Sequence, residues 1–466
     1  MKSAVIDPLT LYTHCQIIGF GPACISLLIA ADREGILPSL LVKGLVIHEK
    51  SAGTNALLSG GINYSLPSNS DAVDFLSGIS VNGLFAPVLL LPAARMIYAA
   101  GESAVSLQIV AMLVADIRQC FLQLLSHSIN SHIIYNSQVE SIDQRGQQWS
   151  ICTSNTAAIA EIVLSKLHLS TKENLQNRLT HCSYAHQTLH HQRRVVSPYV
   201  VMASGSYPHI PPEISRYCRQ QNIPLQHSEQ ILRENNIPMT ASATKSPIVI
   251  IGASHSGFSV LHQLLSQHSG CQQNIKIVYR SVIRRMHISI RAAKEAGEDF
   301  DHSVDICPEN GRVFRFQGLY KRSKRLFEDV VNNHYPFVSL HQCTHKQAFT
   351  QHLQHASLVV SATGYLPRLP IIRDHLQQPV QFAQQGSALM LSEHGNLCCV
   401  DGHPISGLMA IGLGFGRRHS GIGEPSYSGA PVGINIFQGA DGEAICKQLG
   451  ATILLPSESQ YEEECV

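Results

Sequence analysis

Two glycine-rich loops, each between an apolar strand pattern and an apolar helix pattern, constrain the fold of this chain most. The first lies in residues 15–31, CQIIGFGPACISLLIAA, and contains Gly19, Gly21, Pro22 and Ala23. Glycines at such a junction allow a tight turn and let the backbone approach a pyrophosphate at the positive N-terminus of the helix. A second apolar strand, 44–49, follows and ends in Glu49, where a carboxylate would accept hydrogen bonds from a ribose. We interpret residues 15–49 as a βαβ unit that binds a dinucleotide.

The same pattern recurs in residues 247–265, PIVIIGASHSGFSVLHQLL, whose loop contains Gly252, Ser254, Ser256 and Gly257. The next apolar strand, 275–279, ends at Arg280 rather than at an acid, and Arg284 and Arg285 follow. A carboxylate in that place would repel a 2′-phosphate, whereas a guanidinium can pair with it. The pattern therefore predicts NADPH rather than NADH at the second loop, and a solvated basic turn is the alternative.

Two dinucleotide loops in one chain indicate electron transfer between two cofactors. A flavin accepts hydride from a nicotinamide, so we predict FAD at the first loop and NADPH at the second.

Two further strand patterns end in similar small turns on either side of the second glycine loop. Residues 199–208 read YVVMASGSYP, and residues 358–367 read LVVSATGYLP, with Thr363 and Gly364 in the second turn. We interpret the turns as the two crossings between an FAD domain and an inserted NADPH domain. The predicted fold is α/β with two Rossmann-like dinucleotide-binding domains. The predicted boundaries are 1–240 for the first part of the FAD domain, 245–360 for the NADPH domain and 361–466 for the C-terminal part of the FAD domain, which would cover the flavin or the substrate.

These segments together resemble the class B flavin-dependent monooxygenases, which include flavin-containing, N-hydroxylating and Baeyer–Villiger enzymes. The resemblance rests on both glycine loops, on SYPHIP at 206–211 and on ATGY at 362–365. It implies that NADPH reduces FAD, that O₂ forms a C4a-hydroperoxyflavin, and that one oxygen passes to an amine nitrogen or a sulfur of a small molecule. Two alternatives stay open: an NADPH-dependent flavin oxidoreductase or oxidase without oxygen transfer, and a non-catalytic, redox-sensing flavoprotein.

The resemblance also assigns roles to two residues outside the glycine loops. Segment 60–70, GGINYSLPSNS, is similar to the part of flavin-containing monooxygenases in which an Asn lies beside the isoalloxazine, which makes Asn69 the catalytic candidate. Its amide could hydrogen-bond an oxygenated flavin, although Pro, Ser and Asn also form ordinary turns. By the same resemblance the backbone of Val139 lies near the FAD adenine, and a plain hairpin is the alternative.

Composition narrows the remaining classes. With 34 Lys and Arg against 33 Asp and Glu, the chain lacks the basic footprint of a nucleic-acid binder. Its longest apolar stretch, 83–101, is interrupted by Pro87, Pro92 and Arg95, which argues against a membrane span. Thirteen Cys without framework spacing, and an N-terminal stretch without a secretory pattern, predict a cytoplasmic protein.

Three smaller predictions concern metal binding, a competing enzyme class and contacts to the substrate. The His-rich segment 181–194 lacks zinc-module spacing, so we predict no metal. No C-x-x-C occurs, which disfavours a disulfide reductase. A glycine-rich segment near the C-terminus contains the candidate substrate contacts Arg417, Arg418, Glu424 and Tyr427.

Overall fold

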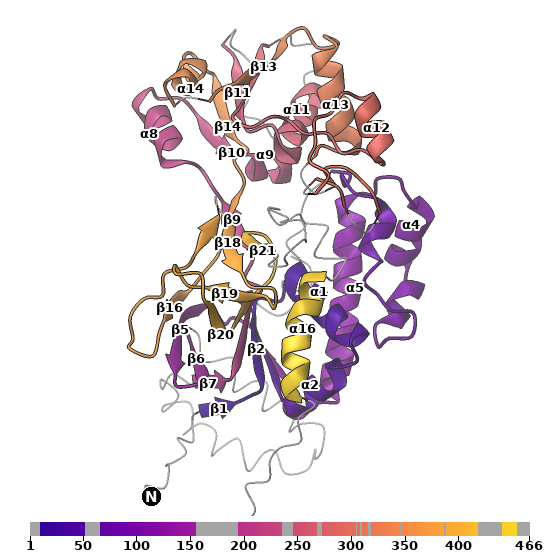
Figure 1. The fold of residues 1–466 in the computed structure, drawn as a ribbon, viewed down its shortest axis with the longest axis vertical. Coiled ribbons are helices and arrows are strands. Elements are labelled where there is room, and N and C mark those ends of the chain that lie inside the picture. Colours follow the sequence, from indigo (N-terminus) through magenta and orange to yellow (C-terminus); the bar gives the residue numbers. More distant parts are fainter. Residues whose placement is uncertain are drawn as a thin grey trace, which may run out of the picture.

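The computed structural model describes the chain as two units stacked along its long axis, each built on a parallel sheet (Figure 1). The described residues are 10–51, 66–154, 194–234, 246–267, 273–303, 305–307, 310–315, 318–344, 346–385, 388–417 and 440–453.

The first unit is centred on five parallel strands whose residues are mostly buried. In spatial order they are β20 (Pro404–Ala410), β8 (Tyr199–Met202), β2 (Cys15–Ile18), β3 (Leu45–His48) and β4 (His132–Ile134). Near-continuous apolar runs form such strands because both faces of the sheet are covered. Beyond β20 the sheet continues through β19 (Asn396–Cys398), β18 (Ala388–Leu391) and β17 (Gln384–Gln385), with β21 (Phe415–Arg417) pairing with β18.

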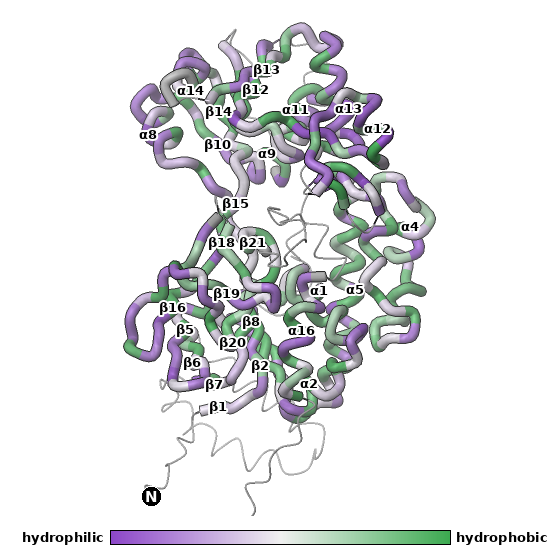
Figure 2. Tube along the Cα trace, in the orientation of Figure 1, coloured by the Kyte–Doolittle hydropathy of each residue, from purple (hydrophilic) through white to green (hydrophobic). Residues whose placement is uncertain are grey.

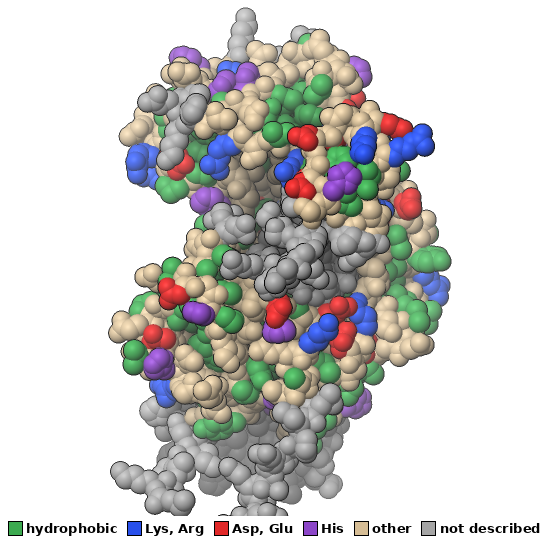
Figure 3. Space-filling view, in the orientation of Figure 1, with side chains coloured by type: hydrophobic (Ala, Val, Ile, Leu, Met, Phe, Trp, Pro, Cys, Tyr) green, Lys and Arg blue, Asp and Glu red, His purple; other side chains and the backbone are tan. Residues whose placement is uncertain are grey.

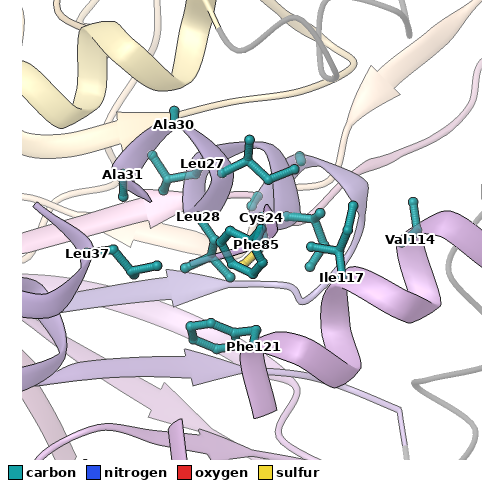
Figure 4. Packing of buried hydrophobic residues seen from close by; sticks show 14 of the residues in the cluster. Cys24, Leu27, Leu28, Ala30, Ala31, Leu37, Phe85, Val114, Ile117 and Phe121 are labelled. Carbon is teal, nitrogen blue, oxygen red and sulfur yellow. The ribbon is translucent and has the colours of Figure 1, made fainter. Parts of the chain in front are cut away.

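Helices form the core on one face of this sheet. They are α1 (Pro22–Arg33), α2 (Leu37–Lys43), α4 (Pro92–Ala100), α5 (Leu107–Ser126) and α16 (Ala440–Ile453), with the 3₁₀ helices η1 (Ala72–Phe75) and η2 (Ala86–Leu90). In Figure 4 the side chains of Cys24 and Leu28 from α1 meet those of Phe85, Ile117 and Phe121. In Figure 2 the hydrophobic colour predominates along α1 and α5.

A smaller sheet covers the opposite face. Its strand order is β1 (Thr10–Tyr12), β7 (Arg194–Ser197), β6 (Gln148–Thr153), β5 (Val139–Arg145) and β16 (Ile371–Arg373). Ile142 and Trp149 of this sheet pack in one cluster with Val200 and Leu408 of the central strands.

The second unit has a five-stranded parallel sheet of its own. The strand order is β10 (Leu225–His227), β14 (Leu358–Ser361), β11 (Ile248–Ile251), β12 (Ile275–Tyr279) and β13 (Val338–Gln342). Its helices are α8 (Pro212–Gln220), α9 (Ser228–Glu234), α11 (His255–Gln267), α12 (Ile290–Glu295), α13 (Lys321–Val331) and α14 (Lys346–Leu353).

The chain crosses between the units where the two small turns are located. β9 (Ser206–Pro208) and β15 (Tyr365–Pro367) follow these turns and pair antiparallel with each other. Since β8 and β20 belong to the first sheet and the strands of the second sheet lie between them in sequence, the second unit is inserted into the first, as predicted.

The predicted start of the inserted domain at residue 245 differs from the structure. β10 pairs in parallel with β14, and Ile214 and Cys218 of α8 belong to the second unit's core. The second unit therefore begins before the second glycine loop in sequence. Its edge strand β10 and its helix α8 both come from a segment that precedes that loop. The other boundaries remain predictions.

One helix among the described residues, α5, is long and apolar enough to cross a membrane. In this structure it packs inside the first unit, where Val110, Leu113, Ile117 and Phe121 are fully buried. Its apolar sequence is explained by this core position.

Candidate functional site

A large cavity lies between the two units and is lined by both glycine loops. Its volume is about 1720 Å³, larger than the roughly 300–1,000 Å³ of a typical small-ligand pocket. A cavity of this size has room for more than one ligand. On the face shown in Figure 3, acidic and basic side chains are interspersed and do not form one large patch.

The first glycine loop is shaped by a close approach between two backbone segments. Gly19 has φ +97°, and a Cβ atom there would lie 2.5 Å from the carbonyl oxygen of Ala203. Among the described residues, a Cβ on Gly21 would meet no atom within 4 Å, and Gly21, Pro22 and Ala23 all line the cavity at the start of α1. Gly19 thus holds the loop against β8, while Gly21 leaves space open in front of the helix N-terminus. This is the shape that a pyrophosphate requires.

Glu49 lies at the end of β3 with its carboxylate turned back to the loop. Its Oε2 accepts from the Phe20 N–H at 2.8 Å, and its Oε1 accepts from the Ser51 N–H at 2.9 Å. An ionised carboxylate has about four acceptor positions, so two remain for a ligand hydroxyl in the cavity that Glu49 lines.

His48 is held neutral just before Glu49. Burial lowers the pKa of His48 to about 4. Its Nε2 is 3.1 Å from Gln16 Oε1, an acceptor only, so Nε2 carries the proton and Nδ1 accepts from the Ser137 hydroxyl at 3.2 Å. This network fixes the strand end from which Glu49 projects.

The network predicts a pH-dependent stability. Because the folded-state pKa of His48 lies below its ordinary 6.5, its stabilising contribution is complete above pH 6.5 and is lost as the pH falls toward 4. From pH 7 to pH 5 we expect His48 to account for a loss of about 2 kcal/mol in the free energy of unfolding. Urea unfolding at both pH values should show that His48→Gln removes this share of the loss. The exposed His127→Gln should not; an unchanged pH dependence in His48→Gln would contradict the assignment.

The second glycine loop repeats the first in its contacts. Gly252 has φ +107°, and a Cβ there would lie 2.4 Å from the carbonyl oxygen of Ala362, the counterpart of Ala203. Gly252, Ser254 and Ser256 line the cavity. The small-residue turns after β8 and β14 therefore have a second role that sequence reasoning missed: they are the surfaces on which the two glycine loops rest.

The three arginines after β12 differ in their partners. Arg284 pairs with Asp305 at 3.2 Å, and Arg285 pairs with Glu298 at 2.5 Å. Arg280 is exposed and lines the cavity, and within the described part of the chain no acid is in contact with its guanidinium. Of the three, Arg280 is the one whose charge is available to a ligand phosphate.

Two of the predicted cofactor-binding residues do not line the cavity, and their assignment stays a prediction. Gly257 does not line the cavity, because it packs against its own loop: a Cβ there would lie 2.1 Å from the Gly252 carbonyl oxygen. Gly364 is also absent from the cavity lining, and its carbonyl accepts from the His209 N–H at 3.0 Å. Thr363 does line the cavity, with its hydroxyl donating to the His209 carbonyl at 2.6 Å.

Asn69 and Val139 line the same cavity from the first unit. The Oδ1 of Asn69 accepts from the Ser323 hydroxyl at 3.2 Å, and Ser323 belongs to α13 of the second unit. With Oδ1 engaged in this way, the amide N–H groups of Asn69 are its remaining hydrogen-bonding groups. Val139 opens β5 at the cavity, and its pairing with β6 forms the hairpin that was the alternative interpretation.

Sequence reasoning missed three cations of the first unit. Arg118 of α5 is only 3% exposed, donates to the Phe20 carbonyl, and lies over the Phe20 ring with its Cζ 5.2 Å from the centroid. A lone basic residue in a mostly apolar helix is the signal that could have found it. Burial lowers the pKa of Lys50, and the positive charge of Arg368 adds to this effect. Arg118, Lys50 and Arg368 all line the cavity and add positive charge near the first loop.

Several predictions fall outside the described residues. These are the His-rich segment up to residue 193 and the substrate-contact candidates Arg418, Glu424 and Tyr427. Among the residues that the structure does describe, no three His, Cys, Asp or Glu side chains come together as a metal site.

Residues 165–287 match the model of the family described as L-lysine 6-monooxygenase/L-ornithine 5-monooxygenase. A curated relative, the CMP-5'-(3-aminopropyl)phosphonate hydroxylase of Streptomyces rubellomurinus, is 26% identical over 216 residues, which are 43% of this chain and 49% of the relative. The chain thus matches about half the length of that relative. The resemblance to N-hydroxylating flavin monooxygenases is confirmed by these matches.

Solved structures show the same fold at low identity. The cadaverine monooxygenase of Erwinia amylovora, bound to FAD, aligns with a TM-score of 0.55 at 12% identity over 97% of both chains. The ornithine N-hydroxylase of Kutzneria sp. 744, with reduced FAD, NADP⁺ and L-ornithine, gives 0.53 at 12% identity over 94% of this chain and 99% of the other. The L-lysine 6-monooxygenase of Pseudomonas syringae gives 0.52 at 13% identity over 94% and 99%. The predicted α/β fold with two Rossmann-like domains is confirmed.

Proposed function

We propose that this chain is a monooxygenase that uses FAD and NADPH to transfer one oxygen atom from O₂ to an amine nitrogen of a small molecule. The observation that carries the proposal is one cavity lined by two glycine loops, one followed by Glu49 and the other by Arg280. Two dinucleotides bound at these loops would share one space, which hydride transfer between them requires.

The residues present fit the two cofactors. In front of Gly21 the space is open at a helix N-terminus, and Glu49 has acceptor positions left for the FAD ribose. Ser254 and Ser256 face the cavity at the start of α11, and Arg280 presents an available guanidinium to the 2′-phosphate of NADPH. When bound, the flavin would supply the redox chemistry: reduced by NADPH, it would activate O₂ at C4a, as the sequence resemblance implies.

The choice of an amine nitrogen follows the comparisons. The matched family acts on lysine or ornithine by its description, and the solved relatives are named for amine substrates. The chain's own part would be to position the amine, exclude water and donate a hydrogen bond from Asn69 to the oxygen being transferred.

A disulfide reductase is disfavoured by the cavity lining. Among the described residues that line it, Cys343 is the one cysteine, and burial raises the pKa of its thiol. A dithiol mechanism needs a pair of cysteines with an accessible thiolate.

The test is a reaction balance. Purified protein loaded with FAD is mixed with NADPH, O₂ and a panel of primary amines, and hydroxylated product and H₂O₂ are measured per NADPH consumed. We expect product with at least one amine and a correspondingly lower H₂O₂ yield. H₂O₂ equal to NADPH with every amine would favour the oxidase alternative, and a flavin that NADPH does not bleach would favour the non-catalytic one.

Arg280 gives a prediction on cofactor choice. Replacing it in Arg280→Glu removes a charge-assisted pair with the 2′-phosphate and adds repulsion, so we expect the KM for NADPH to rise about 10- to 150-fold. Use of NADH relative to NADPH should improve. Steady-state kinetics with both nucleotides measure this, with Arg291→Gln on the exposed face of α12 as the matched control. Unchanged NADPH kinetics would mean that the 2′-phosphate is held elsewhere.

A further inference from the structure

The loop that carries Asn69, residues 66–74, is bonded to both units at once. Its backbone belongs to the first unit, through hydrogen bonds from Leu107 N–H to the Leu66 carbonyl (3.0 Å), from Ser68 N–H to the Val105 carbonyl (2.7 Å) and from Ala72 N–H to the Ser103 carbonyl (3.1 Å). Its side chains reach the other way, since Leu66 packs against the core of the second unit and Asn69 bonds to Ser323. We call residues 66–74 the bridging loop.

Asp71 is the centre of this second attachment. Its side chain is 3% exposed. Both terminal nitrogens of Arg312 lie 3.2 Å from its Oδ2, the Tyr320 hydroxyl donates to Oδ1 at 3.0 Å, and the Lys321 ammonium is 2.7 Å from Oδ1. All three donors come from the second unit, from residues that lie more than 240 positions further along the chain. A buried carboxylate with this many donors is satisfied only while the two units are docked.

Two residues of this contact depart from their usual local conformations or hydrogen bonds. Asp71 is the residue before η1, where an aspartate ordinarily caps its own helix, yet its side chain makes no such bond. Lys321 adopts φ +48°, a conformation that non-glycine residues rarely take. It also begins α13, the helix that carries Ser323. Such strain persists where the surrounding contacts over-determine it.

The contact lies across the cavity from the covalent crossings. Figure 1 shows β9 at the junction on one side, and α13 above α4 and α5 on the other. Arg312 and Tyr320 also line the cavity, with Asp71 behind them, so the wall facing a ligand is made of the same side chains that hold the bridging loop.

We propose that Asp71 is a positioning residue: by holding Arg312, Tyr320 and Lys321 of the second unit, it fixes the bridging loop so that Ser323 orients the amide of Asn69. The inference rests on the proposed function, because it deepens the account of how the oxygen-transfer site is assembled. It makes docking of the nicotinamide-binding unit a condition for a correctly oriented Asn69.

The test combines a reaction measurement with one that needs no cofactor. Asp71→Asn keeps the side-chain shape but removes the charge. We expect product formed per NADPH consumed to fall about 10- to 100-fold, since a small misplacement of a reacting geometry has effects of that size. FAD content should stay near wild type, because Gly21 and Glu49 lie elsewhere. Hydrogen–deuterium exchange of the protein without cofactors should become faster in peptides covering 66–76 and 310–324.

The control removes a comparable ion pair that does not join the units. Arg373 Nη1 lies 2.9 Å from Asp143 Oδ1 on two strands of the first unit, and neither residue lines the cavity. Asp143→Asn should leave the product ratio within about twofold of wild type. Should Asp71→Asn fail to fold, Arg312→Gln leaves Tyr320 and Lys321 on Asp71 and should shift both readouts in the same direction.

The outcomes separate the two claims. If exchange in the two segments is unchanged in Asp71→Asn, or if it rises while the product ratio stays at the wild-type value, Asp71 has no positioning role. If the wild type hydroxylates no amine, the proposed function fails. Faster exchange in Asp71→Asn would then still show that Asp71 holds the bridging loop to the second unit.

Discussion

Gly21→Val should purify as a folded protein without the yellow colour of bound flavin. A Cβ at Gly21 meets no atom of the described residues within 4 Å, and Gly21 lines the cavity, so we expect the valine side chain to extend into the cavity. There it would occupy the space of the FAD pyrophosphate and block the helix N-terminus of α1. We expect the Kd for FAD to rise by about 100-fold or more, equivalent to about 2.7 kcal/mol. Absorbance at the flavin band per mole of protein measures the effect.

Two control variants test whether the loss of flavin in Gly21→Val comes from the blocked ligand space. Gly21→Ala adds only the Cβ and should show an intermediate loss, which no protein contact explains. Gly450→Ala, in α16 away from the cavity, should keep full flavin content; the nearest atom to its added Cβ is Ile36 Cγ2 at 3.3 Å. Thermal unfolding of the flavin-free proteins checks that all are folded. Full flavin content in Gly21→Val would refute the assignment of the first loop.

Asn69→Ala should separate oxygen transfer from the steps that precede it. FAD binding and anaerobic reduction by NADPH need no hydrogen bond from this amide, so both should remain nearly intact. Oxygen transfer should slow about 100-fold, since one preorganised donor at a developing charge is worth about 2.7–4 kcal/mol. Product per NADPH should fall and H₂O₂ should rise.

Asn69→Asp makes the prediction sharper. The carboxylate can still accept from Ser323, which is 3.2 Å from the present Oδ1, but it has lost the N–H donor. If the donor matters, Asn69→Asp should be as poorly coupled as Asn69→Ala. If Asn69 is a turn residue, both variants should lose some thermal stability and keep the wild-type product ratio.

The sequence by itself determined the elements that depend on near neighbours in the chain. The strand–loop–helix patterns at 15–31 and 247–265 became β2 with α1 and β11 with α11, and the hairpin considered at Val139 is formed by β5 and β6. Such patterns are readable because short runs of apolar residues and the backbone freedom of glycine act over a few positions. The two small turns likewise indicated the insertion of one unit into the other.

Which polar side chains already have a hydrogen-bond or ion-pair partner within the protein could be decided only from the tertiary structure. Arg280, Arg284 and Arg285 look alike in sequence, and their difference arises because Asp305 and Glu298 lie in space beside two of them. Nothing in the sequence indicated a role for Asp71, since its partners lie more than 240 residues away and meet it only when the units dock. A glycine loop can be recognised from a short stretch of sequence, whereas the charge left available to a ligand depends on which distant groups the fold brings within hydrogen-bond distance.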